Sequence, residues 1–350
     1  MKVKAKMLAS LLGRTLVVLP LLGFAACTLI KNDLAECPVP VLEIRFVYDY
    51  NMEYANAFHQ QVDCLSAYFF DADGRLVAVE QVTDRQQLAD EAYRMRPGLA
   101  AGNYRVVAYG GMACAETSFA HANPLQAGDH YAGIRVQLDP AALTDPARAR
   151  LHNHYYGSAE FTVDAVEDTY ATVEMMRNTN SVQVALQHTN GAPIDCDDFC
   201  FEIVDDNNVF NHANDLLATG EITYIPYNTE NRSTGTVGDS RAADNEWHAA
   251  LAQFNTSRLV PRSAAKPTAA TLRVSRADDG EPVLEVPLVN YMLLFKSDSP
   301  AGLGYLGDQE YLDRENSWRF VFFLDEASGT WVQNRIVVND WEVRMNDTDF

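Results

Sequence analysis

The sequence predicts an all-β chain built from β-sandwiches. Short stretches rich in β-branched and aromatic residues recur along its 350 residues, and many alternate apolar with polar side chains. A period of two residues is typical of half-buried strands. Turn residues separate these stretches, and we find no apolar pattern of helical period running for about 10–15 residues between them. The order of elements therefore favours sandwiches over an α/β sheet.

The first half contains six predicted strands. Val41–Tyr50 alternates apolar and polar residues and is expected to be half-buried. Val62–Phe70 and Arg75–Val82 flank Asp71-Ala72-Asp73-Gly74, whose glycine accepts the positive φ of a hairpin turn. Asp84–Tyr93 fits either a short helix or a loop. The other expected strands here are Tyr104–Tyr109, Gly133–Leu138 and Ser158–Val163.

The second half continues with strands and polar turns. We expect Asn228–Asn245 to be a long polar loop, because it is rich in Asn, Ser, Thr and Gly. The expected strands are Thr169–Met176, Ser181–Gln187, Phe199–Val204, Thr271–Ser275, Val283–Val286, Trp318–Leu324 and Trp331–Met345. We place an N-terminal sandwich at residues 41–165 and a C-terminal sandwich at residues 166–350.

The N-terminal segment is typical of an exported lipoprotein. Four basic residues, the last of them Arg14, precede an uncharged run from Leu16 to Ala26. That run is too short to cross a bilayer, which takes roughly 20 helical residues, but it suits a secretory signal. Two small residues stand directly before Cys27, as bacterial lipoprotein processing requires. Ordinary secretion with cleavage after Ala25 is the alternative.

Lipidation would make Cys27 the attachment point to a membrane. The thiol would receive a diacylglycerol, the chain would be cut before it, and the new amino group would be acylated, for example with palmitate. One acyl chain binds a membrane only marginally, whereas three would hold the protein there. We therefore expect a signal peptide at residues 1–26 and a polar, proline-bearing tether at residues 27–40.

The charge and cysteines fit an extracytoplasmic protein. The formal charge is −21, and removing the basic leader would make it more negative, which disfavours nucleic acid as a partner. Five cysteines follow Cys27, so at most two intramolecular disulfides can form. A bridge between Cys64 and Cys114 is plausible because both lie in strand-like stretches, and the pairing otherwise stays open. The other three are Cys37, Cys196 and Cys200.

No motif argues for catalysis, a metal or a cofactor. Gly302–Gly307 matches G-x-G-x-x-G, but neither a preceding strand nor a βαβ unit is expected there. Asp71–Gly74 lacks the spacing of a calcium-binding EF-hand. His152 and His154 have no third metal ligand nearby, and Cys196 and Cys200 have no second ligand pair. We therefore expect no catalytic residues, no metal and no cofactor.

Several stretches together resemble FimB-type fimbrial anchor lipoproteins of Bacteroidetes. They occur in the expected order over nearly the whole chain, with Tyr109 standing where the family more often has Trp. The stretches are Glu36-Cys37-Pro38, Phe46–Met52, Ala55–Phe58, Val62–Gly74, Gly102–Gly111, Thr256–Leu259, Asp308–Asn316 and Ile336–Trp341. The resemblance implies two transthyretin-like β-sandwiches in tandem and no enzyme activity.

The resemblance also implies a cellular role. A lipid on Cys27 would hold the protein at the outer membrane, at the base of a fimbrium, and would leave open which membrane face it occupies. The implied partners are fimbrial shaft subunits, and the implied role includes limiting fimbria length. Related subunits polymerise by strand exchange, in which a terminal strand of one subunit fills a groove in the next.

The closing strand is the candidate for such an exchange. Trp341, Val343 and Met345 alternate with charged residues, so they would share one face. A strand of this pattern can add to an exposed sheet edge, where backbone hydrogen bonds give affinity and alternate side chains fill pockets. The alternative is that the strand completes its own sandwich.

Two other functions fit the same composition. A glycan-binding surface lipoprotein would share the tether and the sandwiches, and would need exposed, coplanar aromatic residues around a groove. A secreted hydrolase would need two carboxylates at glycosidase spacing, which a sequence does not reveal.

Overall fold

The computed structural model describes residues 40–233, 247–263, 269–298, 302–339 and 341–343. Within them, strands dominate, and the predicted all-β fold is confirmed. The described residues from Leu42 onward form one compact unit. Cys27 and the expected leader lie outside the described residues.

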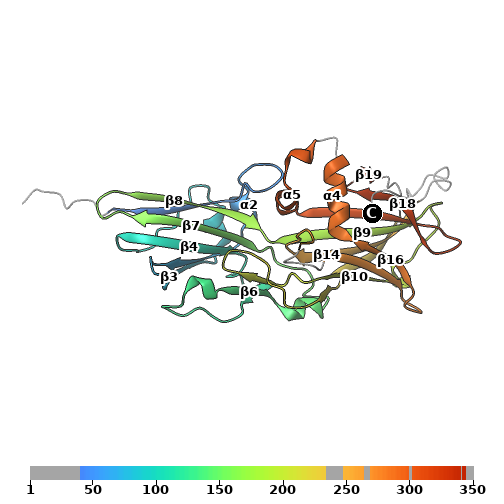
Figure 1. Cartoon of the computed structure of the whole chain (residues 1–350), viewed down its shortest axis with the longest axis horizontal. Coiled ribbons are helices and arrows are strands. Elements are labelled where there is room, and N and C mark those ends of the chain that lie inside the picture. Colours follow the sequence, from blue (N-terminus) through green and yellow to red (C-terminus); the bar gives the residue numbers. More distant parts are fainter. Residues whose placement is uncertain (1–39, 234–246, 264–268, 299–301, 340, 344–350) are drawn as a thin grey trace, which may run out of the picture. The chain divides into compact units, whose positions relative to one another are not determined.

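A six-stranded sheet contains most of the strands of the first half (Figure 1). Its order is β1 (Leu42–Val47), β8 (Thr169–Arg177), β7 (Tyr155–Val163), β4 (Gly102–Gly110), β2 (Leu65–Phe70) and β3 (Leu76–Val82). β1 runs parallel to β8, and the other neighbours are antiparallel. Alternate residues of β1 are buried, as the period of two predicts.

The two faces of this sheet have different covers. On one face, Phe46, Phe69 and Val106 pack in a cluster with residues of the short helices α2 (Phe58–Gln61) and α3 (Arg85–Ala89). The other face meets a three-stranded sheet, whose order is β11 (Val209–Asn211), β6 (Arg135–Leu138) and β5 (Phe119–His121). The apolar cluster on that second face continues without a break into the second half of the chain.

The second half forms a sandwich of a six-stranded and a four-stranded sheet. Trp318, Phe320 and Phe322 are fully buried in the larger sheet, whereas Leu272 and Val274 are buried in the smaller one. The larger sheet runs β13 (Asn228–Ser233), β14 (His248–Ser257), β9 (Thr179–His188), β17 (Ser317–Leu324), β18 (Trp331–Val338) and β19 (Trp341–Val343). The smaller sheet runs β12 (Ile222–Tyr224), β10 (Phe199–Asp205), β15 (Thr271–Arg276) and β16 (Pro282–Pro287).

Two helices in this half were not predicted. Helix α4 (Leu288–Asp298) contacts β15, β18 and β19, and helix α5 (Asp308–Arg314) follows it (Figure 1). The sequence of α4 is apolar on nearly every side, so it shows no helical period. Lys296 of α4 donates to the carbonyl of Leu306 at 3.1 Å and pairs with Asp308, which joins the two helices.

A strand occupies the start of the expected second-half loop, another strand follows the loop, and residues 234–245 of the loop lie outside the described residues. β13 occupies Asn228–Ser233, where we expected a loop, and its side chains are mostly exposed. It hydrogen-bonds along its length to β14, which lies in an alanine-rich stretch that we did not predict as a strand. Pairing with a neighbouring strand therefore outweighs the low strand propensity of both segments.

The expected division after residue 165 stays a prediction. β8, the first strand beyond that point, pairs with β1 and β7 in the first sheet. β11, from farther along the chain, pairs with β6. The chain thus passes back to the first sheet after residue 165, and contacts of the two halves interleave.

The hairpin at Asp71–Gly74 forms as predicted. β2 pairs with β3, and Gly74 has φ +75°. Asp71 Oδ1 accepts hydrogen bonds from the backbone N–H groups of Asp73 at 3.0 Å and Arg75 at 2.9 Å. A Cβ on Gly74 would lie 2.5 Å from the His130 ring, so this turn requires glycine for both space and conformation.

The disulfide between Cys64 and Cys114 also forms, with 5.4 Å between the Cα atoms. Cys64 directly precedes β2, and the bridge closes a separation of 50 residues. Cys196 is buried and Cys200 exposed, and both are free thiols. Cys37 lies outside the described residues.

Candidate functional site

The predicted partner strand lies at a sheet edge. β19 pairs antiparallel with β18 and is the last strand of the larger C-terminal sheet. The register sets Trp341 opposite Val338 and Val343 opposite Ile336, and these two β18 residues are fully buried. Met345 lies outside the described residues. In the single chain, therefore, β19 hydrogen-bonds to β18 and forms the edge of its own sheet. A partner strand could add to the sheet at this edge.

Two of the stretches that carry the family resemblance meet through a buried ion pair. Arg258 follows β14 and Asp313 lies on α5, and their side chains are 16% and 4% exposed. Arg258 Nε donates to Asp313 Oδ1 at 2.7 Å and Nη2 donates to Oδ2 at 2.6 Å. This bidentate geometry is the strongest form of an arginine–carboxylate contact. No sequence pattern indicates that these two residues touch.

Further hydrogen bonds satisfy the groups around this ion pair. Arg258 Nη1 donates to the carbonyl of Asn214 at 3.0 Å. Gln309, one turn before Asp313 on α5, donates to Asp313 Oδ1 at 2.7 Å and to the carbonyl of Leu259 at 3.2 Å. A buried charge is stable only when it is paired and hydrogen-bonded in this way. We call these residues the polar junction: Asn214, Arg258, Leu259, Gln309 and Asp313.

The polar junction continues into the first half through asparagines. Asn178 and Asn214 exchange hydrogen bonds between their amides at 2.7 and 2.9 Å, and both are buried. The Asn178 amide also lies 3.3 Å from Nδ1 of His154. An amide NH₂ group only donates, so Nδ1 of His154 must accept, which requires a neutral imidazole.

His154 is stacked in an aromatic cluster. Its ring centroid lies 4.6 Å from that of Phe119 and 5.7 Å from that of Tyr109. Burial lowers the pKa of His154 to about 3, with a smaller contribution from nearby His121. Burial likewise lowers the pKa of His121 to about 4. Of the histidine pair singled out from the sequence, His154 is thus a core residue, while His152 is half-buried and lies 3.6 Å from Glu116.

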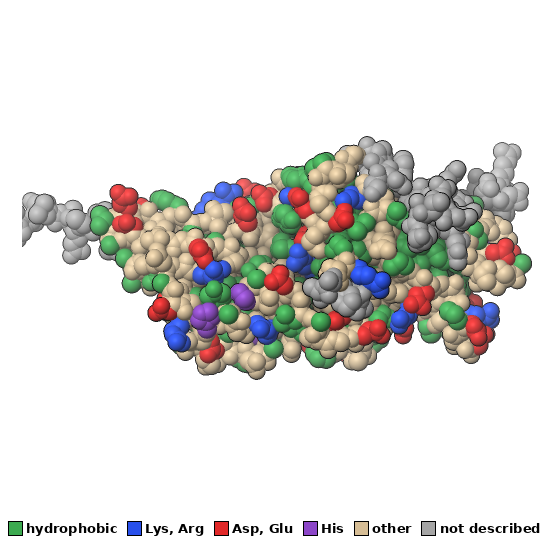
Figure 2. Space-filling view, viewed as in Figure 1, with side chains coloured by type: hydrophobic (Ala, Val, Ile, Leu, Met, Phe, Trp, Pro, Cys, Tyr) green, Lys and Arg blue, Asp and Glu red, His purple; other side chains and the backbone are tan. Residues whose placement is uncertain are grey.

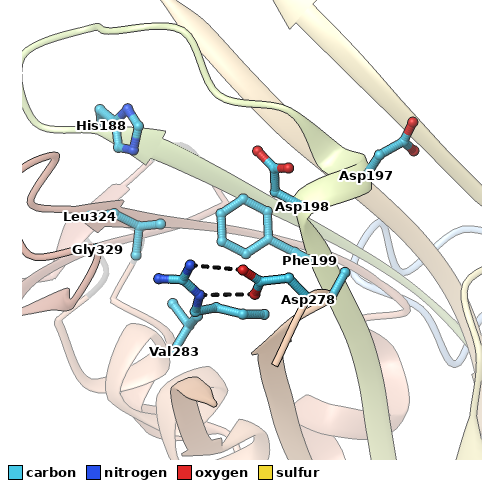
Figure 3. A pocket seen from close by; sticks show the side chains of 10 residues that line it. His188, Asp197, Asp198, Phe199, Asp278, Val283, Leu324 and Gly329 are labelled. Atoms are coloured by element: carbon cyan, nitrogen blue, oxygen red, sulfur yellow. Dashed lines mark hydrogen bonds and ion pairs between the residues drawn. The ribbon is translucent and has the colours of Figure 1, made fainter. Parts of the chain in front are cut away.

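A recess of about 480 Å³ opens where β9 and β17 end (Figure 3). Its wall includes Arg276, whose Nε and Nη2 contact the Asp278 carboxylate at 3.2 and 3.1 Å. The hydrogen bond from Arg276 holds the pKa of Asp278 below its ordinary value. Figure 3 shows His188 apart from the carboxylates of Asp197 and Asp198. The residues drawn there form no pair of nucleophile and base.

In the acidic turn before β10, the Asp195 carboxylate is hydrogen-bonded to groups of the same chain. Asp195, Cys196 and Asp197 place ligand-type atoms within 4.8 Å of one another. Asp195 Oδ1 accepts from the Asn231 amide at 2.8 Å and from the Asp197 N–H at 3.1 Å, which lowers the Asp195 pKa. The contacts of Asp195 thus hold the turn against β13.

Charged side chains of both signs are interspersed on the face in Figure 2. The net negative charge is therefore not gathered into one patch on that face. Among the described helices, none combines the length and apolar character needed to span a membrane.

Comparisons with known proteins identify related chains. Residues 34–347 match the model of the family described as fimbrillin-A associated anchor proteins Mfa1 and Mfa2. A candidate adhesin from Bacteroides thetaiotaomicron is 42% identical, with a TM-score of 0.80, and the match covers 90% of this chain and 100% of that one. A search of the curated proteins gave no match.

Two further solved structures share the fold. A candidate polysaccharide-binding protein from Bacteroides thetaiotaomicron is 26% identical, with a TM-score of 0.73, covering 89% of this chain and all of that one. The fimbrial anchor protein Mfa2 from Porphyromonas gingivalis is 16% identical, with a TM-score of 0.63 and coverage of 88% and 100%. At that identity the likeness to Mfa2 shows the fold alone.

The ion pair generates the first prediction. Arg258→Ala should lower the free energy of unfolding by about 3–5 kcal/mol, because it leaves the Asp313 carboxylate buried without a counter-charge. Arg276→Ala is the matched control: its ion pair is half exposed, so the loss should stay below about 1 kcal/mol. Denaturation in urea measures the free energy of unfolding of both variants. Equal losses would contradict the prediction that the buried ion pair stabilises the fold more than the exposed one.

The second prediction concerns pH. Unfolded histidines bind protons below pH about 6.5, whereas folded His154 and His121 stay neutral until about pH 3–4. The unfolded state then binds more protons, so the free energy of unfolding should fall as pH drops from 6.5 toward 4, by up to about 1.4 kcal/mol per unit for each histidine.

A histidine substitution separates this effect from the titration of carboxylates. His154→Phe should reduce the pH dependence of unfolding by about half of the histidine contribution, since one of the two histidines is removed. Val77→Ala, which changes an exposed residue without an ionisable group, should leave the dependence as in the parent. Urea denaturation at pH 7, 5.5 and 4.5 makes the comparison, and an unchanged slope in His154→Phe would refute the assignment.

Proposed function

This chain belongs to the family of fimbrillin-A associated anchor proteins, and we propose that it is a lipid-held minor subunit at the base of a fimbrium. The family match over residues 34–347 is the observation that carries this proposal. In the proposed role, Cys27 carries the lipid, residues 27–40 are the tether, and the folded part holds the shaft at the outer membrane. A further part of the role is to limit fimbria length.

The polar junction suits a protein that transmits force. Arg258 and Asp313 are held by hydrogen bonds with defined directions, whereas apolar contacts can slide past one another. α5 also reaches the first half of the chain, since Arg314 donates to the carbonyls of Asp49 and Asn51 at 3.4 and 3.3 Å. Force applied at the C-terminal sheet would thus pass into the first sheet through fixed polar contacts.

We place the contact with shaft subunits at the closing strand. Trp341, Val343 and Met345 are the proposed partner-binding residues. β19 is only three residues long and has a neighbour on one side, so its other backbone edge is available for β-augmentation within the described sheet. Strand exchange is the alternative mode of the same contact: β19 would leave β18 and pair with a shaft subunit. The role needs no catalytic step and no cofactor.

A glycan-binding lipoprotein is the second candidate. A relative 26% identical to this chain is described as a candidate polysaccharide-binding protein. Tyr54 and Tyr305 are exposed, and Arg314, which stacks on the Tyr54 ring, lines a cavity.

The tether provides the third prediction. Cys27→Ala should leave the fold intact and release the protein, with any attached fimbriae, into the medium, because the acyl chains are lost. Cys200→Ala is the control, because it removes an exposed free thiol from the folded part. The Cys200→Ala protein should stay with the cells. Immunoblots of cells and medium give the result. Retention of the Cys27→Ala protein as firm as that of the parent would remove the main support for the anchor role.

The closing strand provides the fourth prediction. Deleting residues 341–350 should leave a folded, lipidated protein that no longer retains fimbriae. Deleting residues 344–350 keeps β19 and tells whether the donated segment extends beyond it. Fimbriae on cells are counted by electron microscopy, and folding is followed by thermal unfolding. Unfolding of the longer deletion would mean that the strand serves only its own sandwich.

A further inference from the structure

Three tyrosines gather around Arg314 at the surface. The Arg314 guanidinium carbon lies 4.2 Å from the ring centroid of Tyr50 and 4.4 Å from that of Tyr54. The hydroxyl of Tyr305 lies 3.1 Å from that of Tyr54. Tyr54 is 50% exposed and Tyr305 is 70% exposed. We call Tyr50, Tyr54, Tyr305 and Arg314 the tyrosine shelf.

The backbone of Tyr54 is strained. Its φ is +51°, a conformation that costs a non-glycine residue about 1–3 kcal/mol and often marks a functional position. Asn51 holds the loop in this shape, because its amide donates to the carbonyls of Tyr48 and Ala55 at 3.0 and 2.8 Å. The loop thus holds Tyr54 in a costly backbone conformation while the residue stays half exposed.

A cavity of about 510 Å³ lies beside the shelf, and Arg314 lines it. Residues of the loop before α2, of α2 itself and of the end of α5 line the cavity. Both helices are labelled in Figure 1. Polar side chains on its wall include Glu53, Gln60, Gln61 and Glu315. The side chains of Glu53 and Gln60 make no hydrogen bond within the part of the chain that the structure describes. They are available to a ligand.

These groups match the chemistry of a sugar. One face of a pyranose ring carries C–H groups that stack on an aromatic ring, and its edge carries hydroxyls that bond to amides and carboxylates. Pre-formed concave sites with a few placed polar groups are the usual binding sites for small ligands. The carboxylates of Glu53, Glu310 and Glu315, with the acidic chain as a whole, repel an anionic sugar.

We propose that the tyrosine shelf and the adjoining cavity bind a neutral saccharide. Tyr54 and Tyr305 supply the stacking surface, and Gln60 and Glu53 bind hydroxyl groups. Arg314 positions the shelf, because it also bonds Glu310 at 2.8 Å and is only 12% exposed. The proposal rests on the second candidate function above and gives it a site; Tyr54 and Tyr305 lie on elements distinct from β19, so substituting them leaves the proposed strand contact in place.

Affinity gel electrophoresis of the detergent-extracted full chain tests the site. The gels contain mannan, dextran, xylan or a soluble β-glucan, with anionic alginate as a further gel. At least one neutral polysaccharide should retard the protein, and alginate should not. Tyr54→Ala and Tyr305→Ala should each weaken the retardation at least about tenfold, the size of effect that an aromatic anchor typically carries.

Matched variants make the test specific. Tyr170→Ala removes another exposed tyrosine, on β8, and should bind like the parent. Tyr54→Phe keeps the ring and should retain most of the binding. The Tyr54→Ala strain should keep its fimbriae, so failure of this site leaves the anchor role untouched. Absence of retardation by all four neutral polysaccharides, or full retardation of Tyr54→Ala, would overturn the proposal.

Discussion

The buried ion pair between Arg258 and Asp313 is the constraint on which the C-terminal half depends. Two charges taken out of water destabilise a fold unless each finds partners of fixed geometry. Here the bidentate contact, the Asn214 carbonyl and the Gln309 amide provide them. The position of α5 against the end of β14 is therefore specified by hydrogen-bond geometry, which admits few alternatives, in addition to apolar packing.

From this pair, polar contacts extend toward the first sheet. The Asn214 amide pairs with Asn178, and Asn178 contacts the neutral ring of His154. On the other side of α5, Arg314 bonds the loop that follows β1 and supports the exposed Tyr54. One short helix thus links the proposed force path and the proposed saccharide site. The two proposals are compatible, because the proposed anchoring uses the closing strand and the tether.

The fold was largely predictable where side-chain period and turn chemistry act locally. β1 alternates because one face is buried, and Gly74 marks its hairpin because only glycine fits there. Helix α4 was missed because an apolar segment without a period has the same pattern as a buried strand. β13 was missed because its polar side chains stay exposed, and only its hydrogen bonds to β14 make it a strand.

The sequence by itself determined the all-β class, the Cys64–Cys114 bridge as a candidate and the family resemblance, because local patterns and ordered motifs encode them. It also supplied the expectation for Cys27, which depends on residues adjacent in the chain. Only the tertiary structure decided that Arg258 meets Asp313, that β8 joins the first sheet, and that Tyr54 and Tyr305 share a surface. These pairs are 55 to 251 residues apart or depend on strand order, and no local pattern specifies contacts of that kind.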